Sequence, residues 1–264
     1  FADGADIITA SKGTDNVRIG EDAGASIISG GNNNVLVGKD AGTAITTGDD
    51  NVAVGRLALD ANTTGQRNVA VGNQALSTET QGRFSTAVGY SALEATNSTS
   101  TVDTYNVGIG YKAGEATSTG VKNTFVGGLA GLSNVGASNN TAVGFEALTN
   151  NTTASENTAV GYEAAYTNTT GANNSVFGWK ALYDNTTGSK NVAFGLNAGA
   201  SNTTGTNNTF VGAPDSSGFG SGHYITTGSK NTILGAFDGN QNGLDIRTSS
   251  NAIVLSDGDG LPKM

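Results

Sequence analysis

The chain of 264 residues contains no cysteine and only two prolines. The absence of cysteine excludes a disulfide scaffold, thiolate metal sites and thiol catalysis. Charged residues make up only 13% of the chain, aromatic residues 6% and hydrophobic residues 36%, so the sequence offers little material for a conventional globular core. What remains is rich in asparagine, threonine, serine and glycine, with 40 glycines in all.

Basic clusters and long apolar runs are also absent. The 13 basic residues are scattered singly among 22 acidic ones, and the net charge is -9, which argues against nucleic-acid or anionic-membrane partners. No run approaches the roughly 18 apolar residues of a membrane span, so we expect no membrane insertion. The first four residues lack the basic and apolar regions of a signal peptide, as expected of a mature product or an excised segment.

A repeated motif, N-x-x-[VIFL]-G, organises the chain. Nine of its twelve spacings are 17 residues, and the others are 18, 21 and 23. The thirteen copies begin at Asn16, Asn34, Asn51, Asn68, Ser85, Asn106, Asn123, Asn140, Asn157, Asn174, Asn191, Asn208 and Asn231. Such a fixed period is typical of solenoid proteins.

Each position of the 17-residue unit N-T-A-V-G-Y-E-A-L-x-x-N-T-T-G-x-x has an interpretable role. The second and fourth residues are mostly β-branched and share one face of a short strand. Alanine at the eighth position indicates close backbone approach, and the recurring glycines indicate corners with positive φ. The first asparagine either adopts a left-handed corner itself or stacks its amide on the neighbouring coil. Representative motif residues are Asn51, Val54, Gly55, Asn140, Val143, Gly144, Asn157, Val160, Gly161, Asn191, Phe194 and Gly195.

These features predict an all-β fold, a parallel β-solenoid or β-roll of about thirteen coils, on the order of 60 Å long at about 4.8 Å per coil. We expect residues 1–15 to cap it and residues 16–212 to form regular coils, with a short insertion at about 94–105. A second insertion is expected over 213–230. Residues 231–264 would form the last coil and a junction toward a tip or chaperone domain.

A homotrimer is expected because one coil supplies only three or four inward apolar side chains. Three copies around one axis would bury the Val and Ile face of each coil, and closed symmetry would prevent runaway assembly. A monomeric or dimeric solenoid is the alternative.

The motif and its small-residue turn resemble the head repeats of trimeric autotransporter adhesins, which are left-handed parallel β-rolls whose three chains share a core. The resemblance extends from Asn16 to about Gly235. The 17-residue version, with its Thr-Thr-Gly closure, looks more like the shafts of bacteriophage tail fibres. Residues 249–260 resemble the segment before a self-cleaving intramolecular chaperone, which would make Met264 a processed end.

The resemblance implies a non-enzymatic, extracellular shaft, most in keeping with a phage tail fibre that carries a receptor-binding tip. Its partners would be two further copies, adjoining fibre or baseplate proteins and a host-surface glycan or protein, with no cofactor. The alternative is an adhesin head on a bacterial outer surface. A third reading, a glycan-degrading spike, depends on Glu146 and Glu163, which are 17 residues apart and would place two carboxylates about 5 Å apart.

Other candidate sites are few. Phe219, His223 and Tyr224, in the longer insertion, are the candidate receptor contact, although a structural collar or a change in coil diameter explains that segment better. The segment Asp257–Gly260 has a short calcium-loop pattern without the later ligands of such loops. No metal ligands are expected around the single histidine. The sixth-position aromatic residues form either a glycan-binding stripe or a packing rim: Tyr90, Tyr111, Phe145, Tyr162 and Trp179.

Overall fold

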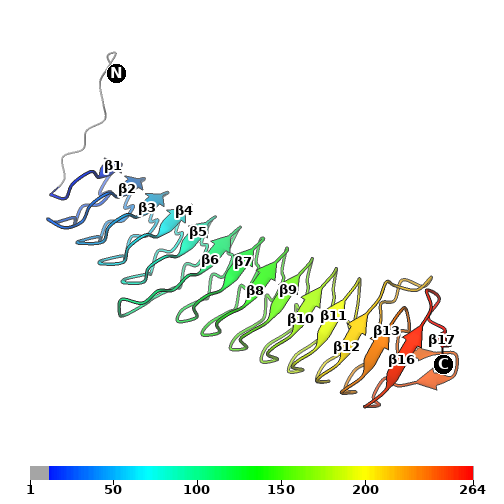
Figure 1. Cartoon of the computed structure of the whole chain (residues 1–264). Helices are drawn as coiled ribbons and strands as arrows, with labels where there is room; N and C mark the ends of the chain where they lie inside the picture. The colour runs from blue at the N-terminus through cyan, green and yellow to red at the C-terminus, as the bar shows by residue number, and fades with distance from the viewer. Residues whose placement is uncertain (1–11, 264) are drawn as a thin grey trace. The chain divides into compact units, whose positions relative to one another are not determined.

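The structure is a computed structural model that describes residues 12–263, which form strands and turns and contain no helix (Figure 1). Residues 1–11 of the expected N-terminal cap and the expected processed end, Met264, lie outside the described residues. The chain divides into two compact units, one ending at Lys122 and the other beginning at Asn123. Each unit is a parallel β-solenoid built from coils of about 17 residues, which confirms the predicted fold class.

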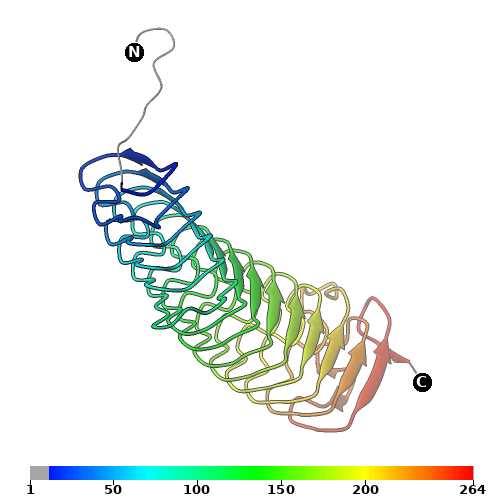
Figure 2. The ribbon, with the colours of Figure 1, turned by 60° about the vertical axis from the view of Figure 1, so that its left-hand side comes forward.

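Each motif copy supplies one three-residue strand, which pairs in parallel with the strand one coil further on. Val52 pairs with Val69 in unit 1, and Thr141 pairs with Thr158 in unit 2. Figure 2 shows the successive coils of each unit stacked with their strands in one row. Unit 1 contains β1 (Val17–Ile19), β2 (Val35–Val37), β3 (Val52–Val54), β4 (Val69–Val71), β5 (Thr86–Val88) and β6 (Val107–Ile109).

Unit 2 continues this pattern and then ends it with antiparallel pairs. Its regular strands are β7 (Thr124–Val126), β8 (Thr141–Val143), β9 (Thr158–Val160), β10 (Ser175–Phe177), β11 (Val192–Phe194), β12 (Thr209–Val211), β13 (Thr232–Leu234) and β16 (Ile253–Ser256). Two short strands, β14 (Asn240–Gln241) and β15 (Leu244–Asp245), form a hairpin. The last strand, β17 (Pro262–Lys263), pairs antiparallel with β16 and covers that edge of the sheet.

The core of each coil lies between the strand and the turn segment that returns opposite it. The third motif residue points inward, and Leu36 in β2 is fully buried there. A Cβ atom at Gly42, in the opposite turn segment, would lie 2.8 Å from Leu36 Cδ2, so the two walls are in direct contact. The alanine at the eighth position is also fully buried, as in Ala58 and Ala164. The small residues of the repeat therefore allow a narrow, two-walled core.

Asparagine side chains form a hydrogen-bonded ladder along the coils. Asn157 donates from Nδ2 to the Gly171 carbonyl at 2.9 Å, and its Oδ1 accepts the backbone N–H of Asn174 at 2.9 Å. This confirms the predicted amide ladder. Asn157 does not adopt the alternative, a left-handed corner. The preceding residue, Glu156, takes that conformation instead, with φ 64°.

Further left-handed residues redirect the backbone within every regular coil. Leu57 and Leu59 both have positive φ, 56° and 54°, which large side chains rarely adopt. The N–H of Leu57 donates to the Lys39 carbonyl of the preceding coil at 3.0 Å, whereas the N–H of Leu59 donates to the Ala75 carbonyl of the next coil at 3.0 Å. Hydrogen bonds in both axial directions thus hold the turn wall as well as the strands.

Glycine is required for different reasons at the two positions of the repeat where it recurs. Gly161, which ends a motif, has φ +140°, as the sequence predicts for a corner. Gly171, from a Thr-Thr-Gly closure, does not have positive φ; a Cβ atom there would lie 2.2 Å from the Gly188 carbonyl oxygen. The closure glycine is therefore required by the close stacking of coils.

Both insertions leave the stack and rejoin it. In unit 1, stacking resumes where the backbone of Arg83 forms an isolated parallel β-bridge with that of Asp103. In unit 2, it has resumed by His223, whose carbonyl accepts the N–H of Ser201 at 3.0 Å. Residues 214–219 therefore form the projecting part of the second insertion, and the residues that follow complete a regular coil.

Candidate binding surfaces

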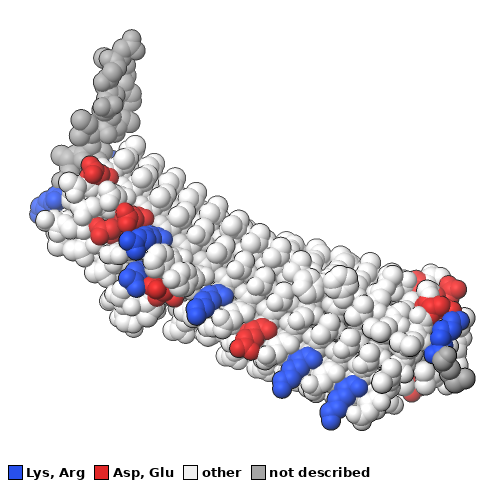
Figure 3. All heavy atoms as spheres, viewed as in Figure 1, with Lys and Arg blue, Asp and Glu red and all other residues white. Residues whose placement is uncertain are grey.

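The strand face, defined by the second and fourth motif residues, points away from the core of its own chain. These side chains are apolar or hydroxyl-bearing in every coil, and Phe194, Val192 and Phe177 remain 57%, 40% and 36% exposed. In Figure 3 the surface over β8–β13 is almost uncharged, apart from one file of charged side chains along the edge at which the strands begin. The position just before each motif asparagine, at that edge, carries the exposed residues Glu156, Lys190 and Lys230.

The sixth-position aromatic rings form a stacked ladder rather than open platforms. Phe145 stacks on Tyr162 with ring centroids 5.7 Å apart, and Tyr162 stacks on Trp179 at 6.2 Å. Tyr90 and Tyr111 stack in the same way in unit 1, at 5.7 Å. Each of these rings therefore has at least one face stacked on a neighbouring ring, which reduces the area that a sugar could contact. This favours the packing-rim interpretation over the glycan stripe.

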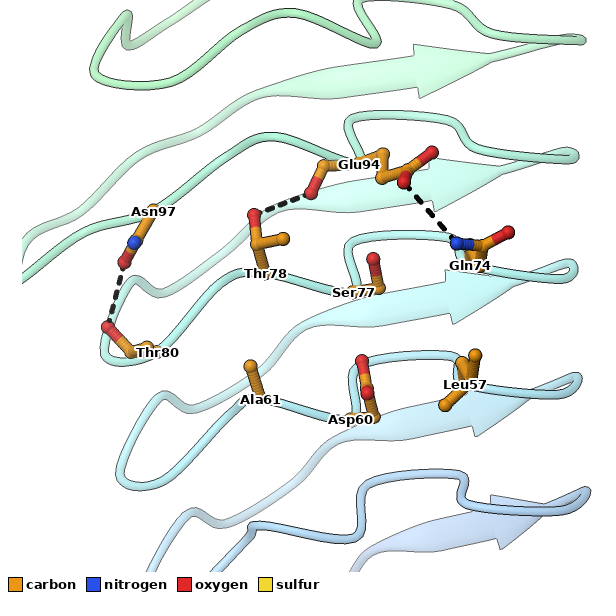
Figure 4. A pocket seen from close by; sticks show the side chains of 9 residues that line it. All are labelled: Leu57, Asp60, Ala61, Gln74, Ser77, Thr78, Thr80, Glu94 and Asn97. Carbon is orange, nitrogen blue, oxygen red and sulfur yellow. Dashed lines mark hydrogen bonds between the residues drawn. The ribbon is translucent and has the colours of Figure 1, made fainter.

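A polar hollow opens on the turn wall of unit 1, opposite β3, β4 and β5 (Figure 4). Its volume is about 460 Å³. The lining side chains are Leu57, Asp60, Ala61, Gln74, Ser77, Thr78, Thr80, Glu94 and Asn97. They come from three consecutive coils, and Figure 4 shows Asp60, Ser77 and Glu94 in one file along the coil axis. No basic residue lines the hollow, so its charge is negative.

Internal hydrogen bonds hold one side of this hollow and leave the other side available. Gln74 Nε2 donates to Glu94 Oε1 at 3.4 Å, and Thr80 Oγ1 donates to Asn97 Oδ1 at 3.1 Å. Asp60 differs, because its Oδ1 atom is buried without a hydrogen-bond partner. Burial raises the pKa of the Asp60 carboxyl group above its ordinary value. No sequence motif marks this hollow, which arises from side chains changing between successive coils.

The structure brings the three candidate receptor residues together. Ring centroids are 4.8 Å apart for Phe219 and His223, 5.0 Å for Phe219 and Tyr224, and 4.7 Å for His223 and Tyr224. Burial lowers the pKa of His223. Asp215 orders the loop, since its Oδ1 accepts the Phe219 N–H at 3.1 Å and its Oδ2 accepts Gln241 Nε2 at 2.7 Å. The cluster is therefore folded against the last coils.

The remaining sequence candidates are engaged in local contacts. Glu163 pairs with Lys180 of the next coil, Nζ to Oε2 3.1 Å, and that lysine lies 4.8 Å from the Trp179 ring centroid. Asp257 accepts the N–H of Leu261 at 2.9 Å and pairs with Lys263 Nζ at 2.7 Å. The bond with Lys263 has the largest effect on the pKa of Asp257, and both bonds lower it. Glu163 and Asp257 therefore both make structural contacts within this chain.

Residues 12–263 contain neither a cluster of metal ligands nor a candidate membrane span. No group of three or more histidine, cysteine, aspartate or glutamate side chains in that range is placed to hold a metal ion. The described residues also contain no helix of the length and hydrophobicity that crossing a membrane requires. Comparison of the chain with protein-family models, curated proteins and solved structures found no match.

Proposed function

We propose that this chain is a non-enzymatic shaft segment of an extracellular fibre in which three copies pack their strand faces against one another. The observation that carries the proposal is the strand face itself. Each coil places two uncharged, largely apolar side chains outside its own core, and they recur in register at the fourth position, as in Val160, Phe177 and Phe194. Leaving such a row in water along every coil is unfavourable.

A second copy of the same chain is the partner that fits this face. The row repeats once per coil, at about 4.8 Å, so a partner must present apolar groups at the same axial spacing to cover it. Another copy of the solenoid does so by construction. Closed three-fold symmetry would bury all the rows and leave none for further growth.

The exposed strand face is a more specific reason for association than a thin core. The described coils fill their own interior with third-, eighth- and ninth-position side chains and asparagine ladders. Association is needed for the strand face rather than for the interior. The resemblance of the repeat to tail-fibre shafts favours a phage tail fibre, with a receptor-binding tip and baseplate-linked proteins as its neighbours.

A bacterial adhesin head is the second candidate. The observation that favours it is the polar hollow, which lies on the wall opposite the strand face and would remain open in such a trimer. Incubating fluorescent segment with host cells separates the two functions. Side-on binding by the isolated segment supports the adhesin, and a segment that leaves the cells unlabelled supports the shaft.

Mass photometry tests the trimer. The expected particle has three times the 26.3 kDa chain mass. A double variant with Phe177→Ser and Phe194→Ser should dissociate more readily at low concentration, whereas Thr170→Ser, a change on an exposed corner, should not. A stable single-chain particle with the wild-type sequence would overturn the proposal.

A further inference from the structure

We propose that the polar hollow of unit 1 is a binding site for a neutral saccharide of about two sugar rings. The proposal does not depend on the trimer, because the lining residues all come from the turn wall of one chain (Figure 4). It assigns to the side of the solenoid a ligand-binding role in addition to that of a spacer.

The size and lining of the hollow define the ligand class. Its volume of about 460 Å³ is in the range of small-molecule sites, but those are mostly apolar. Here carboxylates, amides and hydroxyl groups alternate, and Leu57 and Ala61 supply the apolar part. Hydroxyl groups on a saccharide can donate to the carboxylates and accept from the amides, and the apolar faces of its rings can contact the two aliphatic side chains.

An unpaired acceptor strengthens the assignment. The buried Oδ1 of Asp60 has no hydrogen-bond partner, and leaving such an atom unsatisfied is unfavourable. The backbone N–H groups of Asp60 and Ala61 offset only part of the effect of burial on the pKa of this carboxyl group. A ligand hydroxyl group would satisfy it. The raised pKa of Asp60, caused by burial, is consistent with a site in which water solvates this carboxyl group poorly.

The number of carboxylates argues against a metal ion. Asp60 and Glu94 occupy the same position of the repeat two coils apart, so their backbone positions lie about 10 Å from one another, twice the spacing of adjacent strands. They are the only two carboxylates in the lining, and residues 12–263 hold no group of three or more possible metal ligands. An elongated ligand lying along the coil axis can reach both, with Ser77 between them.

The charge of the site selects against acidic sugars. Two carboxylates line the hollow without a lysine or arginine, so a uronic acid would bring a third negative charge into a half-buried surface. Neutral sugars avoid this repulsion. We therefore expect lactose, maltose or N,N′-diacetylchitobiose to bind in preference to a hyaluronan disaccharide.

Saturation-transfer NMR on the full chain, followed by titration, tests the site with these four disaccharides and with 1,5-diaminopentane. We expect at least one neutral disaccharide to bind, and Asp60→Asn and Glu94→Gln each to weaken it about tenfold. Ala61→Phe, which fills the hollow without removing a polar group, should abolish binding. Matched charge changes elsewhere, Glu156→Gln and Asp184→Asn, should leave it unchanged.

Several outcomes would overturn the assignment. These are no binding of any neutral disaccharide at millimolar concentration, binding that Ala61→Phe leaves intact, or binding confined to the diamine or to the anionic sugar. Circular dichroism of each variant shows that the coil is retained. Mass photometry measures the oligomeric state, whereas saturation-transfer NMR measures sugar binding. The trimer could therefore be refuted while the sugar site is supported, and the reverse.

Discussion

Asn174 donates its backbone N–H to the Oδ1 atom of Asn157, 17 residues earlier, at 2.9 Å. Asn157 in turn donates from Nδ2 to the Gly171 carbonyl at 2.9 Å, and both asparagines are buried. One side chain thus satisfies backbone groups in its own coil and in the next. The repeat of this bond explains why asparagine recurs at the start of nearly every motif.

Replacing Asn157 with alanine should therefore destabilise unit 2. The change leaves the buried N–H of Asn174 unsatisfied and removes one of the two donors to the Gly171 carbonyl, which Asn168 Nδ2 still contacts at 2.9 Å. We expect a loss of roughly 1–3 kcal/mol in the free energy of unfolding. Chemical denaturation followed by circular dichroism measures it. Thr170→Ala, on an exposed corner, should change stability by less than about 0.5 kcal/mol. Equal effects of the two changes would contradict the role of the ladder.

The motif glycine should tolerate no side chain. Gly161 has φ +140°, and a Cβ atom would lie 2.3 Å from the Gly178 carbonyl oxygen of the next coil. Gly161→Ala should cost about 3 kcal/mol or more, because strain and a backbone clash combine. Gly258→Ala is the control, since nothing lies within 4 Å of its Cβ position. Comparable melting temperatures for the two variants would refute the close stacking of coils.

Acidification should weaken the collar around His223. Burial lowers the pKa of His223 below its ordinary value of 6.5, so the unfolded chain binds a proton more readily than the folded chain. The contribution of His223 to the free energy of unfolding is fully present above pH 6.5, the ordinary pKa of histidine. It decreases as the pH falls from there through the lower pKa of the folded state. Melting temperatures between pH 7.5 and 5 measure this. His223→Gln should remove the part of the decrease that arises from this group; an unchanged profile would show that it does not.

Asp60 should behave in the opposite way. Burial raises its pKa, so its charged form is disfavoured in the folded state, and stability contributed by the protonated form is lost as the pH rises. Asp60→Asn should therefore raise the melting temperature at pH 7, while Asp184→Asn, on an exposed side chain, should not. A lower melting temperature for Asp60→Asn would mean that the carboxylate makes favourable contacts that the hollow does not show.

The period of the sequence predicted the coil, its strands and the asparagine ladder, because each depends on residues that recur every 17 positions. The identity of the inward side chain was harder to predict. Alanine occupies the third position and the larger valine the fourth, as in Ala159 and Val160, yet the smaller residue is the buried one. Hydrophobicity alone would favour the reverse.

The left-handed turn residues and the polar hollow had no sequence signal. Leu57 and Leu59 are residue types that normally avoid positive φ, and hydrogen bonds to the two neighbouring coils hold them there. The hollow depends on a change at one repeat position from Asp60 to Ser77 to Glu94, which has meaning only once the coils are stacked. Features that depend on contacts between neighbouring coils could not be predicted from the sequence of a single repeat.

The burial of the strand face between copies is the central claim, and site-directed spin labelling tests it most directly. Because the chain has no cysteine, Val160→Cys provides a single attachment site on that face. We predict an immobilised nitroxide with strong dipolar coupling that disappears when labelled chains are diluted into unlabelled ones before assembly. A mobile label at Val160→Cys without coupling, like that at Thr170→Cys on an exposed corner, would contradict the account.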